Sequence, residues 1–137
     1  MIQMKEIKFK FEDLKLYQKA LDFVDNTYKV TENFQSNENF SLTSQFRRAS
    51  ISIALNIAEV SGDTNAQFNR FLNIANGSIK ECVVCSSIAK RLNYVSNEID
   101  YSNRLKLEEL SKMTASLKKY LMSNNKKTND QRLSTND

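Results

Sequence analysis

The sequence of 137 residues has no proline, no histidine and no tryptophan, and it has only two glycines. Proline and glycine are the residues that most often interrupt helices and build tight turns, so their scarcity favours long helices over hairpins. The Asn76-Gly77 pair has the composition of a hairpin turn, but it lies inside a helical pattern. The sequence therefore predicts an all-α fold.

The absence of histidine removes the commonest general base and the commonest metal ligand. Cys82 and Cys85 form a Cys-x-x-Cys, but no second cysteine pair completes a zinc site. We interpret both as small buried residues in a reducing compartment. Glu59 and Glu81 are carboxylates in predicted helices, but a di-iron bundle needs Glu-x-x-His motifs. We therefore expect a non-enzymatic protein without a cofactor or metal.

Long apolar runs are also missing. No stretch approaches the roughly 18 consecutive apolar residues of a transmembrane helix. The first residues, Met1 to Lys5, lack the apolar run of a signal peptide. We expect a cytoplasmic protein that does not use a membrane as a partner.

The net charge is +4, which permits contact with nucleic acid but does not require it. Most of the basic excess lies between residues 64 and 93, where one carboxylate stands against four cations. The cations are Arg70, Lys80, Lys90 and Arg91. The excess therefore falls mainly on one predicted helix.

Hydrophobic periodicity predicts four helices, over residues 12–33, 41–60, 65–92 and 98–122. Thr64 and Gln67 have the spacing of a capping box before the third helix, and Ser96 is the expected cap of the fourth. Short connectors predict an antiparallel up-down-up-down four-helix bundle that covers residues 1–123. Residues 124–137 are polar apart from Leu133, which predicts a disordered C-terminal tail. Gly77, inside the third helix, is expected to let another backbone approach closely.

The second predicted helix has three kinds of face. One apolar face repeats at three- and four-residue steps: Leu42, Phe46, Ala49, Ile53 and Ile57. A polar stripe follows the same steps: Gln45, Arg48, Ser52, Asn56 and Glu59. The remaining face is again apolar: Ile51, Leu55 and Ala58. A helix that is apolar on two sides is expected to be contacted on two sides, so the polar stripe is expected to be partly buried and to need partners.

The same helix carries a specific resemblance. Its run of Gln-x-x-Arg-Ala-x-x-Ser-Ile-x-x-Asn-Ile-Ala-Glu, from Gln45 to Glu59, resembles the signature of the four-helix bundle proteins encoded by intervening sequences of bacterial 23S rRNA genes. The resemblance covers about residues 9–122. The chain departs from the family pattern at positions where proline, proline, glycine and a basic residue are typical. These positions hold Gln35, Ala54, Val60 and Asp63.

The resemblance implies a small antiparallel bundle that assembles into homopentamers, with RNA binding as the usual suggestion for its role. A related branch resembles accessory proteins of diversity-generating retroelements, which bind a reverse transcriptase and its template RNA. Two functions follow as hypotheses: an oligomeric RNA-binding protein, or an accessory module for a reverse transcriptase.

The candidate RNA contacts are Arg47, Arg70, Lys80, Lys90 and Arg91, with solvated surface charge as the alternative interpretation of each. The candidates for a structural polar network or interface are Gln45, Arg48, Ser52, Asn56, Glu59 and Glu81. Arg48 is expected to pair with Glu59 or Glu81, within one subunit or across an interface, because a buried charge without its partner is costly. Arg47 is the better candidate for an exposed contact.

Overall fold

A computed structural model describes residues 2–39, 41–60 and 64–134 of the chain, with side chains as far as Asn124. In chain order the elements are the 3-10 turn η1 (Lys10–Asp13), α1 (Lys15–Thr31), the 3-10 turn η2 (Ser36–Glu38), α2 (Leu42–Ala58), α3 (Asn65–Arg91) and α4 (Asn97–Ser134). These described segments contain no strand. The predicted all-α fold with four helices is confirmed.

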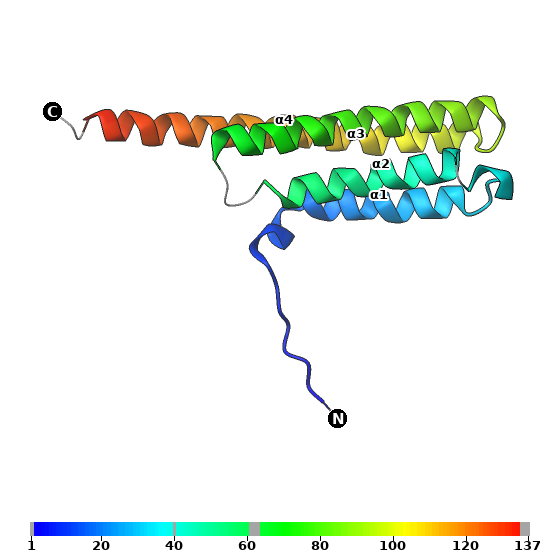
Figure 1. The fold of residues 1–137 in the computed structure, drawn as a ribbon, viewed down its shortest axis with the longest axis horizontal. Coiled ribbons are helices and arrows are strands. Elements are labelled where there is room, and N and C mark those ends of the chain that lie inside the picture. Colours follow the sequence, from blue (N-terminus) through cyan, green and yellow to red (C-terminus); the bar gives the residue numbers. More distant parts are fainter. Residues whose placement is uncertain (1, 40, 61–63, 135–137) are drawn as a thin grey trace.

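The four helices lie side by side along one direction (Figure 1). Each helix packs on the next one in the chain, and α4 also packs on α1, so the contacts close a four-helix bundle. Successive helices run in opposite directions because short connectors join them. The inward faces supply the core. Its most completely buried large side chains are Phe23, Phe46, Ile53, Ile57, Leu72, Leu107 and Leu110.

Local capping interactions set the start of α4 and the end of α3. The hydroxyl of Ser96 accepts a hydrogen bond from the amide of Ile99 at 3.1 Å, which confirms the predicted cap of α4. Asn93 has a φ of 62°, and the amide of Tyr94 donates back to the carbonyl of Ala89 at 2.8 Å. This left-handed residue and backward hydrogen bond form a Schellman motif that ends α3.

The predicted capping box at the start of α3 is wrong in its hydrogen bonds. Thr64 occupies the N-cap position with extended backbone angles, but its side chain makes no capping hydrogen bond. Thr64 and Gln67 are both exposed. The first amide groups of α3 are therefore not capped by the Thr64 side chain.

The predicted ends of the first and fourth helices also differ from the structure. The first turn expected at Glu12 and Asp13 is the separate turn η1, and α1 starts only at Lys15. α4 continues to Ser134 as a helix that projects beyond the other three (Figure 1). The predicted boundary near residue 123 falls on this projecting part, but the chain beyond it is helical, because no proline or glycine interrupts it. Residues 135–137 of the predicted tail lie outside the described residues.

Gly77 does not mediate close packing within the subunit. It is exposed, and no heavy atom lies within 4 Å of the position that a Cβ would take. The neighbouring Ser78 is the buried residue instead. The prediction was wrong because Gly77 falls one helical step outside the packed face.

Among the described residues, no helix is both long enough and apolar enough to cross a membrane.

Candidate nucleic-acid interface

The outward side of α2 forms an open hollow of about 620 Å³ between that helix, α1 and the η2 connector. Side chains from α2 make most of its lining, and Tyr28 of α1 closes one edge. The lining residues are Tyr28, Asn39, Thr43, Ser44, Arg47, Arg48, Ile51, Ser52 and Leu55. The set contains two arginines and no carboxylate, so the hollow attracts anions.

Arg47 is fixed at the α1 edge of this hollow. Its Nε donates a hydrogen bond to Thr31 Oγ1 at 2.9 Å, and its guanidinium lies 4.4 Å from the centre of the Tyr28 ring. Thr31 in turn donates to the carbonyl of Thr27 at 2.8 Å. These contacts hold the guanidinium at the edge of the hollow. Because Nε already donates to Thr31, this nitrogen is not available to a ligand. The expectation that Arg47 is a simply exposed contact is corrected, because the side chain is only half exposed.

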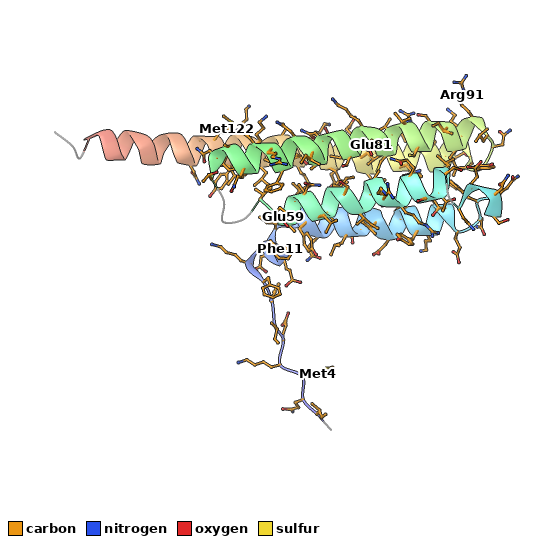
Figure 2. The ribbon with its side chains drawn as sticks, in the orientation of Figure 1. Met4, Phe11, Glu59, Glu81, Arg91 and Met122 are labelled. Carbon is orange, nitrogen blue, oxygen red and sulfur yellow. The ribbon has the colours of Figure 1, made fainter. Side chains whose placement is uncertain are left out.

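Arg48 has the opposite environment from the expected one. It is exposed, and within the described segments it forms no ion pair with Glu59 or Glu81. Glu59 lies near the end of α2, whereas Glu81 lies farther along α3 (Figure 2). An ion pair within one subunit is therefore wrong for Arg48. The pairing across a subunit interface stays a prediction.

A third feature of the hollow is an unpaired hydroxyl. Thr43 is buried, and its Oγ1 finds no hydrogen-bond partner among the described residues. A buried polar group without a partner costs free energy. Because the Thr43 oxygen is enclosed by its neighbours, the groups that the hollow presents to a ligand are the two arginines.

The polar stripe of α2 separates into a paired centre and exposed ends. Ser78 Oγ donates to Ser52 Oγ at 2.8 Å, and Asn56 Nδ2 donates to the carbonyl of Ser52 at 2.8 Å. Gln45 Nε2 reaches Glu81 Oε2 at 3.4 Å. Ser52 and Asn56 are half-buried, as a structural network requires.

The ends of the stripe are not buried within one subunit. Gln45, Arg48 and Glu59 are all exposed, and so is Glu81 of α3, the other residue expected in the polar network. The expected burial is wrong for the three residues of α2 in the single chain, because the second apolar side of that helix has no helix against it. Leu55, at the centre of that side, keeps 62% of its surface exposed.

The four predicted cations of α3 are exposed, and none forms an ion pair in the part of the chain that the structure describes. With 3.6 residues per turn, Lys80 and Arg91 share one side of the helix, whereas Arg70 and Lys90 lie on nearly opposite sides. Arg91 projects at the far end of α3 (Figure 2). The structure therefore does not bring the five candidate RNA contacts together, since Arg47 lies on the α1 side of α2.

Comparison with known proteins identifies the family. The family model for 23S rRNA-intervening sequence proteins matches residues 12–116. The chain belongs to the 23S rRNA-intervening sequence protein family. This match confirms the resemblance carried by the α2 motif. A search of curated proteins found no match to the sequence.

A solved structure shows the same fold. It is the crystal structure of a protein of unknown function from the S23 ribosomal protein family of Bacteroides thetaiotaomicron. The two chains superpose with a TM-score of 0.70 at 24% sequence identity. The aligned part covers 76% of this chain and 95% of the Bacteroides chain. The likeness establishes the bundle as the fold of this family member.

Sequence reasoning missed a buried polar network between α3 and α4 of this family member. Asp100 Oδ1 accepts a hydrogen bond from Ser86 Oγ at 2.7 Å, and its Oδ2 accepts one from Arg104 Nε at 2.9 Å. Asn103 Nδ2 donates to the same Ser86 oxygen at 3.1 Å. Asn26 of α1 donates to Asn103 Oδ1 at 2.9 Å, so the network joins three helices.

The environment of Asp100 keeps its carboxylate charged. Burial on its own raises the pKa of Asp100. The hydrogen bonds from Ser86 and Arg104, with the charges of Arg104 and Lys90, outweigh burial and hold the pKa below 3.8. The sequence contained a signal for this network, because Asp100 and Asn103 share the inward face of α4 with Leu107.

Metal and thiol chemistry find no support in the described residues. No group of three histidine, cysteine, aspartate or glutamate side chains gathers there to hold a metal ion. Cys82 and Cys85 are free and buried. Burial raises the pKa of both thiols, that of Cys85 to about 11, with the charge of Glu81 adding to the effect. Both are therefore protonated and unreactive near neutral pH.

Proposed function

We propose that this protein is a non-enzymatic, RNA-binding homo-oligomer, with five subunits as the number that the family resemblance implies. The observation that carries the proposal is the hollow of α2. There the exposed Arg48 lies beside the fixed Arg47, and no described lining residue is a carboxylate. Two arginines without an opposing carboxylate suit phosphate oxygens.

A single hollow offers few phosphate contacts, so its affinity alone is weak. Repetition of the hollow around an oligomer converts later contacts into intramolecular ones and raises the overall affinity. Each phosphate contact also releases counterions, which makes binding fall steeply with salt. RNA is the polyanion to test first, because the family is encoded within 23S rRNA genes.

The experiment measures binding of the rRNA stem that flanks the coding sequence, by fluorescence anisotropy over a series of salt concentrations. Arg48→Ala is compared with Lys15→Ala, which removes the same charge from an exposed position on α1 that is not a candidate RNA contact. We expect Arg48→Ala to weaken binding about tenfold or more and to flatten the salt dependence, and Arg48→Lys to restore part of both. Light scattering first establishes that each variant keeps the unmodified mass.

Three results would contradict the proposal. The first is no binding near physiological salt. The second is a binding curve without salt dependence. The third is an equal loss in Arg48→Ala and Lys15→Ala, which would mean that only net charge matters. If the protein does not bind RNA but copurifies with a reverse transcriptase encoded beside it, that result would support the accessory-module function instead.

A further inference from the structure

An arm of residues 2–9 leaves the bundle at the start of α1 and extends away from it (Figure 1). Its large apolar side chains are almost fully exposed: Ile2 92%, Met4 91%, Ile7 82% and Phe9 64%. Four such side chains on one short extended segment are more than the scattered apolar residues of an ordinary surface. Met4 lies well clear of every helix (Figure 2).

The base of the arm is fixed, so its direction is a property of the fold. The amide of Phe9 donates to Glu12 Oε2 at 2.6 Å, and Lys8 Nζ lies 2.7 Å from Asp13 Oδ1. The ring of Phe9 stacks on that of Phe11. η1 therefore directs the arm outward, and Ile2, Met4 and Ile7 stay exposed along it.

An apolar groove of about 500 Å³ lies on the other side of α2 from the arginine hollow, between α2 and α3. Its floor includes Val84, Ile88 and Leu92, which keep 55%, 41% and 49% of their surfaces exposed. Two carboxylates, Glu38 and Glu81, stand at the groove against one cation, Lys80. The groove is thus apolar and slightly acidic.

The arm and the groove complement each other in charge and in length. The arm is mainly apolar and carries Lys5 and Lys8 against Glu6, a small basic excess that the exposed pair of Lys8 with Asp13 reduces. It suits the acidic groove and not the arginine hollow. Its extended length of about 26 Å at 3.3 Å per residue exceeds the roughly 18 Å of α3 from Lys80 to Leu92 at 1.5 Å per residue.

The groove belongs to a different subunit from the arm that fills it. The arm starts beside the end of α2, whereas the groove includes Leu42 at the other end of that helix. The separation along α2 is about 26 Å, the full length of the arm. Within one chain only the tip of the arm reaches the groove, and Ile7 cannot lie on Ile88.

We infer that the arm of one subunit docks in the α2–α3 groove of a second copy of this chain, with Ile7 and Phe9 on Val84, Ile88 and Leu92. The inference deepens the oligomer part of the proposed function, because it names the surfaces that join the subunits. It does not depend on RNA binding.

A disulfide test separates docking between copies from docking within one. Two variants are made in a Cys82→Ala, Cys85→Ala background: Ile7→Cys, and Ile88→Cys with an added tag that changes its mass. Circular dichroism establishes that each keeps its helical content. The two are mixed, allowed to exchange subunits and oxidised. We expect a disulfide-linked pair with the summed mass of the two variants.

Leu105→Cys replaces Ile88→Cys in the matched control, because Leu105 is an apolar residue on α4 with 51% of its surface exposed, against 41% for Ile88. We expect at least fivefold less mixed pair from this control. A mixed pair no more abundant than the control overturns the inference. So does a chain with Ile7→Cys and Ile88→Cys together that forms its disulfide only within itself.

Deletion of residues 2–8 supplies a second measurement, since the arm is no part of the core and its loss leaves the bundle intact. We expect self-association, measured by light scattering, to weaken at least tenfold. If the full chain is an oligomer and the shortened chain remains one at the same concentrations, this inference fails and the proposed oligomer stands. If the full chain is a monomer of 15.8 kDa at micromolar concentration, the oligomer itself fails.

Discussion

Replacement of Asp100 by alanine tests the buried network that joins α3 and α4. The carboxylate is 3% exposed and accepts hydrogen bonds from Ser86 at 2.7 Å and Arg104 at 2.9 Å. Its removal costs the two charge-assisted hydrogen bonds and leaves the Ser86 hydroxyl proton without an acceptor. The lost contact with Arg104 contributes little to this cost, because 45% of the Arg104 side chain is exposed and water can replace the lost partner.

The expected loss in the free energy of unfolding is about 3 kcal/mol, most of it from the Ser86 hydrogen bond and the buried site. For a bundle of this size that loss lowers the melting temperature by about 10 °C. Asp25→Ala is the matched control, because Asp25 is an exposed carboxylate on α1. We expect it to change the free energy of unfolding by less than about 0.5 kcal/mol.

The pH dependence gives the prediction a sign. The folded protein holds the pKa of Asp100 below its ordinary value of 3.8, so folding favours the charged form. The stabilisation is therefore present above pH 3.8 and is lost as the pH falls through the lower, folded value. Melting curves of both variants, recorded from pH 7 to pH 3, measure the effect. Equal melting temperatures for Asp100→Ala and Asp25→Ala at pH 7 would refute the assigned network.

Three further predictions follow from local geometry. Gly77→Ala is expected to raise the free energy of unfolding by about 0.5–1 kcal/mol in urea denaturation, because the site is helical, exposed and empty around the added Cβ; a loss of stability would show that something packs there in the assembled protein. Arg47→Ala is expected to cost about 1–2 kcal/mol through its contacts with Tyr28 and Thr31, and a neutral result in the same titration would mean that the guanidinium is not held. Cys82 and Cys85 are expected to resist a thiol reagent at pH 8 until urea is added, since burial raises the pKa of each thiol; rapid labelling of the native protein would contradict their burial.

Periodicity predicted the inward faces of the helices well, because burial of apolar side chains dominates the choice of face. Leu42, Phe46, Ala49, Ile53 and Ile57 form the expected inner face of α2, and all five are buried. Ser96 caps α4 as expected. These features depend on residues that are close in the sequence, which is why the sequence alone could predict them.

The candidate site was predicted less well, because adjacent helical residues point about 100° apart. Arg47 and Arg48 differ by one such step, and only the position of α1 decides which is held and which is free. Arg47 is the one that is held, because its guanidinium contacts the ring of Tyr28 on α1. The packing expected at Gly77 failed for the same reason, since the buried position is the next one along the helix. Sequence alone does not place the neighbouring helix.

The two sides of α2 would separate the two roles proposed for this helix, assembly and RNA binding. The arginine hollow opens toward α1, whereas the apolar groove opens toward α3. In the proposed docking the arm lies in the groove and does not cover Arg48, so the proposed oligomer would repeat the cations instead of burying them in its contacts. Such an assembly would multiply the proposed phosphate contacts without competing for them, which is the arrangement that gives weak single sites a useful combined affinity.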